Sequence, residues 1–251
     1  MSERFQRTIL LTGEAAFERL RLAHVLILGV GGVGAYAAEQ IARAGVGKIT
    51  VVDGDTVDIS NCNRQLPALT STLGKDKVQV VAGRIREINP ECTITARKEF
   101  ITAESVDALL DSAEFDYAID AIDQLTPKVF FLMGCRKRKI PFVSSMGSGG
   151  KTDPLQLQIA DISKTCGCAL AKAVRSKLKS YGVTKGVRCV FSPEAVSKAA
   201  VHSTLDENGI RHTCVGTISY MPAVFGCTCA SVALRTLLSA QPQEKTPLFK
   251  I

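Results

Sequence analysis

Short apolar runs alternate along the chain with longer segments in which apolar positions recur every three or four residues. The apolar runs predict strands, which in the first part of the chain cover residues 25–28, 49–53, 93–96, 117–120 and 141–145. The recurring pattern predicts helices between them, at residues 35–44, 77–88, 103–112 and 128–139. Strands that alternate with helices pair in parallel, because each connecting helix packs back onto the sheet. The sequence therefore predicts an α/β fold with a Rossmann-like, doubly wound and mostly parallel sheet.

The two ends of the chain extend this predicted sheet. Residues 1–22 have the pattern of an amphipathic helical arm, with a break at Gly13. Beyond the sheet, the pattern predicts strands at 155–160 and 187–191, a basic helix at 169–181 and a long apolar helix at 220–238. The polar segment 197–216 contains a turn signal, Asn208-Gly209. We interpret residues 1–251 as one domain, which consists of an arm, a nucleotide-binding part and a C-terminal elaboration at residues 1–22, 23–150 and 151–251.

Composition and charge narrow the classes of function. The net charge of +7 over 251 residues favours an anionic partner such as a nucleotide, a nucleic acid or an acidic protein. Aromatic residues make up only 6% and Trp is absent, which argues against a surface that stacks single-stranded bases. We expect no secretory signal, because residues 1–5 begin no apolar stretch, and no membrane span, because no window approaches ~18 apolar residues. Nine cysteines are an odd number for a disulfide framework, so we expect reduced thiols in the cytoplasm.

A glycine-rich turn joins the first predicted strand to the first predicted helix. Its glycines are Gly29, Gly31, Gly32 and Gly34. A side chain at these positions would keep the backbone away from a phosphate, whereas the helix N-terminus offers it N–H donors. Asp53 ends the next strand, 24 residues after Gly29, where an acid can accept hydrogen bonds from ribose hydroxyls. These features predict a site for a nucleotide that contains a ribose.

The residues after Asp53 distinguish between kinds of nucleotide. An amide, a guanidinium and an ammonium follow it in Asn61, Arg64 and Lys77. Such a set suits a triphosphate, because the cations neutralise charge on phosphoryl oxygens. Asp120 and Asp123 stand at the carboxyl end of a predicted strand, where carboxylates can hold Mg²⁺. The chain has no P-loop motif, which excludes a P-loop NTPase.

Six short motifs stand at the turns and strand ends of the predicted sheet. They are Gly29-Val-Gly-Gly-Val-Gly34, Asp53-Gly-Asp55, Ser60-Asn-Cys-Asn-Arg-Gln65, Gly74-Lys-Asp-Lys77, Ile88-Asn-Pro90 and Asp120-Ala-Ile-Asp123. Together they resemble the ubiquitin-activating-enzyme superfamily, whose bacterial members of the ThiF, MoeB and HesA type adenylate carboxyl groups. The resemblance covers about residues 4–150. It implies ATP-dependent formation of an acyl adenylate in a homodimer.

The resemblance also implies a role for each matching residue. Asp53 would bind the ribose, and Asp123 would hold the Mg²⁺ that accompanies ATP. Phosphate binding and catalysis would fall to Asn61, Arg64 and Lys77. Asp55 and Gln65 would support this site. Arg7 would reach across the dimer to the triphosphate of the second subunit.

Further segments resemble one particular group within this superfamily. They are Phe5-Gln-Arg-Thr-Ile-Leu-Leu-Thr-Gly-Glu14, residues 144–154, residues 160–165, the basic helix at 170–175 and residues 190–194. They are similar to the group of tRNA threonylcarbamoyladenosine dehydratases, which use tRNA as substrate. The implied reaction adenylates the threonylcarbamoyl carboxylate on adenosine 37, and cyclisation then releases AMP, so that one water is lost. This group is also described with a monovalent cation, Na⁺ or K⁺, near the segment that corresponds to 144–165.

Two other functions stay open. An enzyme that adenylates a sulfur-carrier protein would share the chemistry, but such enzymes hold zinc with two Cys-x-x-Cys pairs. Here Cys166 and Cys168, and Cys227 and Cys229, are spaced by one residue, and on a helix such positions point ~200° apart. A dinucleotide-binding sensor or oxidoreductase would leave Arg64 and Lys77 without a role. The sequence leaves open whether Cys166 and Cys168 react or bind metal, and whether a cysteine desulfurase or another sulfur-acceptor partner takes part.

Two basic segments are candidates for contacts with tRNA phosphates. They are the run 136–139 and the dispersed set of Lys172, Arg175, Lys177, Lys179 and Lys185. The run has a second interpretation as a solvated helix end, whose cations complement the helix dipole.

Overall fold

The computed structural model describes residues 3–205 and 211–239, which form a seven-stranded sheet and the helices around it. The strands follow the order β3-β2-β1-β4-β5-β7-β6. Their bounds are β1 (His24–Leu28), β2 (Lys48–Val52), β3 (Thr93–Arg97), β4 (Tyr117–Asp120), β5 (Phe142–Ser145), β6 (Gln158–Asp161) and β7 (Arg188–Phe191). All neighbouring pairs are parallel except β6 and β7. The predicted doubly wound, mostly parallel sheet is confirmed, and its strand order reverses between β1 and β4, where such sheets bind ligands.

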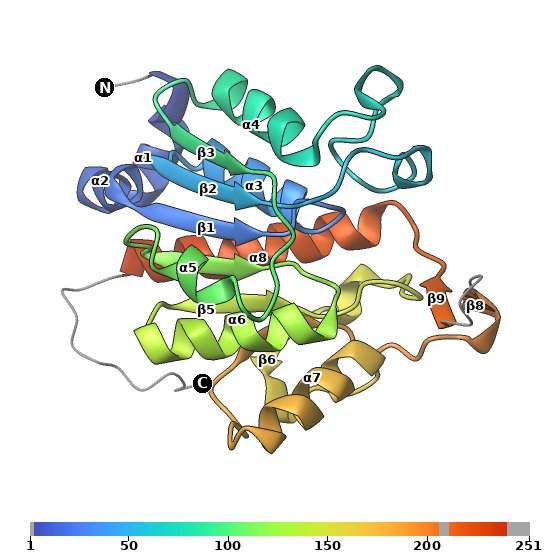
Figure 1. Ribbon diagram of the computed structural model, residues 1–251. Helices are drawn as coiled ribbons and strands as arrows, with labels where there is room; N and C mark the ends of the chain where they lie inside the picture. The colour runs from blue at the N-terminus through green and yellow to red at the C-terminus, as the bar shows by residue number, and fades with distance from the viewer. Residues whose placement is uncertain (1–2, 206–210, 240–251) are drawn as a thin grey trace.

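Helices cover both faces of the sheet (Figure 1). One face carries α3 (Gly34–Arg43), α4 (Lys77–Ile88) and α8 (Tyr220–Ser239), and the other carries α5 (Val106–Leu110), α6 (Leu125–Arg138) and α7 (Ala169–Ser180). Strand β1 shows why its apolar run is continuous. Val25 and Ile27 pack in the core on the α3 and α8 side, whereas Leu26 and Leu28 pack in the core on the α5 and α6 side. A strand that is buried on both faces needs an apolar residue at every position.

The N-terminal arm forms two short helices rather than one. Gly13, at a φ of +81°, separates α1 (Gln6–Thr12) from α2 (Glu14–Leu22), so the predicted break is confirmed. Phe5 and Ile9 are buried, and the ring centroids of Phe5 and Phe17 are 5.4 Å apart. Leu10 and Leu11 point outward, with exposed fractions of 79% and 86%. In Figure 1 both helices lie beside the amino ends of β1 and β2.

The C-terminal half departs most from the predicted elements. The predicted strand 155–160 begins only at Gln158, because Pro154 starts a 3-10 turn that the carboxylate of Asp153 caps. The polar segment 197–216 forms an antiparallel hairpin, β8 (Val201–Leu205) and β9 (Arg211–Val215), which the sequence pattern did not predict. Its predicted turn, Asn208-Gly209, lies outside the described residues.

Two predicted helices also have different lengths. The helix expected at 103–112 is the single short helix α5, and the helix expected at 128–139 begins three residues earlier, as α6. By length and mean hydropathy α8 could span a membrane. Here half of it is buried, and Gly226 packs so closely on α3 that a Cβ atom would lie 2.3 Å from the carbonyl oxygen of Val33. This packing is that of a core helix.

Candidate active site at the carboxyl edge of the sheet

The glycine-rich turn is tight and closely packed. Gly29 has a φ of +84°, which favours glycine, and a Cβ atom on Gly34 would lie 1.8 Å from the carbonyl oxygen of Gly29. Gly31 and Gly32 lie against the motif 60–65. A Cβ atom on Gly31 would be 3.5 Å from the side chain of Gln65, and one on Gly32 would be 3.7 Å from the carbonyl oxygen of Arg64. The fold thus brings two motifs that are separated in the sequence into one site.

Asp53 is attached to this turn by its carboxylate. One carboxylate oxygen accepts a hydrogen bond from the Val30 N–H at 2.7 Å, and the other accepts one from the Asp55 N–H at 2.9 Å. Burial raises the pKa of Asp53, although both hydrogen bonds and Lys77 act in the opposite direction. The acid predicted to bind ribose therefore lies directly beside the glycine-rich turn.

The motif 60–65 forms a compact turn. Asp58 caps the 3-10 turn Ile59–Asn61, and the buried Asn61 accepts a hydrogen bond from the Asp58 N–H through its Oδ1. The Arg64 guanidinium donates to the Ser60 carbonyl oxygen at 2.8 Å and to Asn63 Oδ1 at 2.9 Å. These contacts hold a half-buried guanidinium at the rim of the site.

Lys77 is the first residue of α4, and its side chain is only 6% exposed. Its ammonium pairs with the carboxylate of Asp55 at 2.8 Å, and the side chain of Asp55 is 53% exposed. The two residues that the sequence placed in this site therefore hold each other. Because Asp55 is largely solvated, an anionic ligand can compete with it for the ammonium.

Gln65 has a polar atom without a partner. Its Oε1 is buried and makes no hydrogen bond within the described residues, next to the place where Gly31 approaches the same side chain. A buried acceptor without a donor costs free energy, and a ligand that donates a hydrogen bond would remove that cost. ATP fits such a cradle, because it carries hydroxyl and amino donors together with anionic phosphates.

The carboxylate of Asp120, predicted with Asp123 at this edge, is engaged inside the fold. This carboxylate is fully buried, and it pairs with Lys128 Nζ at 2.8 Å while accepting a hydrogen bond from Ser144 Oγ at 2.6 Å. Its second oxygen accepts from the Ile122 N–H at 3.1 Å. Asp120 therefore cannot also bind Mg²⁺ or ATP directly in this arrangement. Asp123 is exposed at the same edge and is the carboxylate of this pair that a metal can reach.

Sequence reasoning missed Lys128, which organises the loop that carries Asp123. Besides pairing with Asp120, its ammonium donates to the Ile122 carbonyl oxygen at 2.8 Å. Both backbone groups of Ile122 are thus held by one buried ion pair. A signal was available, since Lys128 lies in the first turn of α6, where the helix dipole disfavours a cation.

Phe100 is a second residue that the sequence analysis missed. A Cβ atom on Gly54 would lie 2.5 Å from its ring, so the ring rests on the backbone between Asp53 and Asp55. The ring is nevertheless 66% exposed. An aromatic side chain that is exposed beside the acid predicted to bind ribose is a candidate to stack on a base. Its position just after the predicted strand 93–96 was the available signal.

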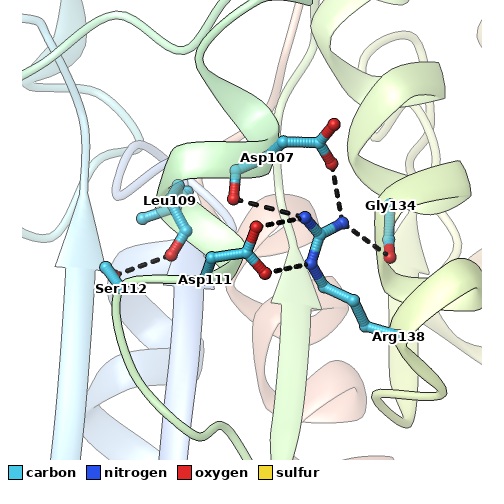
Figure 2. Close-up of polar contacts among 6 residues, drawn as sticks. All are labelled: Asp107, Leu109, Asp111, Ser112, Gly134 and Arg138. Carbon is cyan, nitrogen blue, oxygen red and sulfur yellow. Dashed lines mark hydrogen bonds and ion pairs between the residues drawn. The ribbon is translucent and has the colours of Figure 1, made fainter.

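In the basic run 136–139, the two arginines are bonded within the fold and the two lysines are exposed to solvent. Figure 2 shows the Arg138 guanidinium between Asp107 and Asp111, with both carboxylates at 2.6 Å, so that it joins α5 to α6. Arg136 donates to the carbonyl oxygens of Lys185 and Gly186 at 3.2 and 2.9 Å. Two of the four cations are therefore used within the fold. Lys137 and Lys139 are exposed.

The second basic set divides in the same way. Arg175 donates to the carbonyl oxygens of Ile162 and Thr165, at 3.3 and 3.0 Å, and to Thr165 Oγ1. Its guanidinium is therefore a structural link. The exposed members of the set are Lys172, Lys177, Lys179 and Lys185.

All nine cysteines are free. Cys227 is exposed and Cys229 is buried, so the two thiols do not converge on one metal. Cys166 is exposed, whereas the buried Cys168 caps α7 by accepting from the Ala171 N–H at 3.4 Å. Over residues 3–205 and 211–239, no three His, Cys, Asp or Glu side chains gather as metal ligands.

Arg7 lies on α1, far from the glycine-rich turn. Figure 1 shows α1 at the amino ends of the strands, whereas the turn follows the carboxyl end of β1. Five-residue strands separate these edges by about 17 Å. Arg7 is exposed, and the structure shows no ion pair or hydrogen bond for it within the described residues. It cannot reach the site of its own subunit.

Comparison with known proteins identifies relatives along nearly the whole chain. The sequence profile of the ThiF family matches residues 5–251. The tRNA threonylcarbamoyladenosine dehydratase of Bacillus subtilis is 49% identical over 195 residues, which cover 78% of this chain and 76% of that protein. The enzyme of the same name from Escherichia coli is 40% identical and covers 96% of both chains. A crystal structure of the Escherichia coli enzyme in complex with ATP superposes with a TM-score of 0.86 over 94% of both chains.

Proposed function

The chain belongs to the ThiF family, and from this premise we propose that it catalyses the ATP-dependent dehydration of threonylcarbamoyladenosine at position 37 of tRNA. The enzymes of that name from Bacillus subtilis and Escherichia coli are 49% and 40% identical to it. The observation that carries the proposal is the cradle itself, in which the buried Gln65 Oε1 lacks a donor beside a turn whose Gly29 and Gly34 leave no room for a side chain. A nucleotide would supply that donor.

In the proposed reaction, a carboxylate oxygen of the threonylcarbamoyl group attacks the α-phosphorus of ATP, and the bond to pyrophosphate breaks. Arg64 and Lys77 would neutralise the charge that moves onto the leaving pyrophosphate, and Asn61 would help to orient it. The carbamoyl group then closes onto the activated carbonyl carbon and AMP leaves. In total one water is removed from the tRNA, and ATP becomes AMP and pyrophosphate.

We infer that Asp123 holds the Mg²⁺ that accompanies ATP. It is exposed at the same edge as Lys77, and Lys128 fixes the backbone of the residue before it. Bound there, Mg²⁺ would screen the phosphate charge. Asp53 would accept the ribose hydroxyls, Asp55 would hold Lys77 until the phosphates arrive, and Phe100 would stack on the adenine.

We also propose a homodimer in which Arg7 completes the site of the second subunit. Arg7 cannot reach its own glycine-rich turn, and Leu10 and Leu11 on the same helix are exposed apolar side chains that an interface would cover. Arg7→Ala and Lys77→Ala subunits should each be nearly inactive. When they are mixed and exchanged, activity should return, because one site of each heterodimer then holds both residues. If exchange occurs and nothing returns, Arg7 does not act across the interface.

The function is tested with purified protein and tRNA that carries threonylcarbamoyladenosine. The product nucleoside should be one water lighter by mass spectrometry, and its formation should require ATP and release AMP. Activation of a sulfur-carrier protein, the alternative with the same chemistry, would instead give ATP–pyrophosphate exchange that depends on that carrier and not on tRNA. Such a result would contradict the proposed substrate.

The substrate and the free thiols also bear on where the protein acts and on which partners it needs. We propose that residues 1–251 act as one domain in the cytoplasm, where nine free cysteines stay reduced. A sulfur-transfer partner is not needed for the proposed dehydration, because no sulfur atom enters or leaves.

A further inference from the structure

Lys151 lies fully inside the protein at a place where several loops meet. Its side chain is among the largest that are fully buried, with 1% exposure. Its ammonium donates to the carbonyl oxygen of Gly167 at 2.9 Å and to that of Glu194, which are 16 and 43 residues away in the sequence. Gly167 belongs to the turn before α7, and Glu194 follows β7. One ammonium therefore joins three separate loops.

The loops around Lys151 are tightly packed and joined by further hydrogen bonds. Gly167 has a φ of +65°, and a Cβ atom on it would lie 2.2 Å from the carbonyl oxygen of Pro193. The carboxylate of Glu194 turns back to accept from the Thr152 N–H and the Asp153 N–H, both at 3.0 Å. Lys151 and Glu194 thus hold the two loops together through backbone groups of both.

The bonds of this ammonium resemble those of a bound alkali cation. Buried carbonyl oxygens need a positive or hydrogen-bonding partner, and both K⁺ and a primary ammonium satisfy them with a single charge. Burial lowers the pKa of Lys151, but the nearby Glu194, Cys166 and Cys168 favour its charged form. The resemblance of the sequence implied Na⁺ or K⁺ near residues 144–165. Here Lys151, which lies inside this segment, binds the carbonyl oxygens of Gly167 and Glu194, so the residues present do not fit a metal cation at this place.

We propose that the Lys151 ammonium is a built-in monovalent cation, which orders the loops at 147–153, 166–168 and 193–194 without Na⁺ or K⁺. The loops at 147–153 and 193–194 follow β5 and β7, which end at the edge where Asp123 lies, and the loop at 166–168 leads into α7. Only one consequence rests on the proposed function, namely that the activity does not depend on an alkali cation. Its main readout, thermal stability, does not require any activity.

The first test uses the unaltered protein. Its melting temperature should be the same to within about 1 °C in KCl, NaCl and tetramethylammonium chloride of equal concentration. Tetramethylammonium keeps the ionic strength but is too large to enter a carbonyl cage. A clear loss of melting temperature in tetramethylammonium alone would overturn the inference, because the fold would then need an alkali cation besides Lys151.

The second test removes the ammonium. Lys151→Ala should lower the melting temperature by about 5–10 °C, since two buried carbonyls lose their partner. K⁺ should restore part of the loss, and so should n-propylammonium, which has the shape of the missing side chain. Lys172→Ala, on the exposed face of α7, is the matched control and should respond to neither.

A Lys151→Ala protein that folds but gains nothing from either cation would overturn the inference. If that variant does not fold, the comparison of salts with the unaltered protein still decides. Failure of the proposed function is recognised separately, as absence of tRNA dehydration in every salt by a protein whose melting temperature is unchanged.

Discussion

The lysines at the carboxyl edge of the sheet fall into two kinds. Lys77 pairs with Asp55, whose side chain is 53% exposed. Lys128 and Lys151 are buried, and their partners lie within the fold. Lys128 pairs with Asp120, both of them fully buried, and Lys151 is bound to two backbone carbonyls. The first kind holds a partner that a ligand can replace, and the second kind holds partners that belong to the packed interior of the fold.

This difference separates a binding group from a positioning group. An ion pair with an exposed acid contributes little to stability, so the exchange of that acid for a phosphate costs little. A fully buried pair loses several kcal/mol when one partner is removed, because the other stays charged and unsolvated. We therefore expect the lysine whose partner is exposed, Lys77, to be the one that binds the phosphates.

Lys128→Met should have the largest effect on stability. It leaves Asp120 buried and unpaired, and we expect the free energy of unfolding to fall by about 3–5 kcal/mol. Urea unfolding followed by circular dichroism measures it. The double variant Lys128→Met with Asp120→Asn removes both charges and should recover part of the loss. If Lys128→Met were as stable as the original protein, the carboxylate of Asp120 would not depend on this ion pair.

Lys77→Ala should lower activity strongly and leave stability almost unchanged. Its turnover should fall by about 10²–10³-fold, the usual loss for one preorganised donor of positive charge. The melting temperature should stay within about 2 °C, because the remaining Asp55 is solvated. Dehydration of tRNA under saturating ATP measures the first quantity. Lys75→Ala, exposed two residues earlier, is the matched control. Equal losses of stability in the Lys77 and Lys128 variants would remove the distinction between the two kinds.

Phe100→Ala should weaken ATP binding by about tenfold, towards the lower end of the ~1–3 kcal/mol measured for base–aromatic stacks. The ring is 66% exposed, so only one face is available to a base. The Michaelis constant for ATP should rise while turnover stays close to the original. Phe100→Tyr keeps the ring and should behave like the original protein. An unchanged Michaelis constant for Phe100→Ala would show that the ring does not contact the base.

The smallest effects are expected on the basic surface of α7. Lys172→Glu and Lys179→Glu should each reduce the dependence of tRNA binding on salt by about one in the log–log slope. Arg175→Gln should leave that slope unchanged and lower stability, because its guanidinium is bound to Ile162 and Thr165 within the fold. Filter binding across a salt series separates the two. If Arg175→Gln changed the slope as much as Lys172→Glu, its internal bonds would not exclude it from the RNA surface.

The fold was predictable where burial alone controls the pattern. Each central strand is covered on both faces, so its apolar run is visible in the sequence, and Gly29 and Gly34 of the glycine-rich turn leave no room for a side chain. The hairpin β8–β9 was not predictable from its polar residues, since its strands pair only with each other and lie outside the main sheet. Strand β6 was placed too early, because a proline and an aspartate cap act locally against an apolar pattern.

The sequence by itself determined which residue types stand at the site: glycines in a strand–helix turn, an acid at the end of the next strand, and the cations of two later motifs. Chain order suffices for this, because parallel strands bring their carboxyl ends to one edge. Only the tertiary structure decided which charged groups stay available there. Asp120 and Asp123 look alike in the sequence, as do Arg175 and Lys172, but one member of each pair is bound inside the fold. That outcome depends on distant partners such as Lys128, Ser144 and Thr165, because the packing of residues far apart in the chain sets the hydrogen bonds and the solvation of each charge.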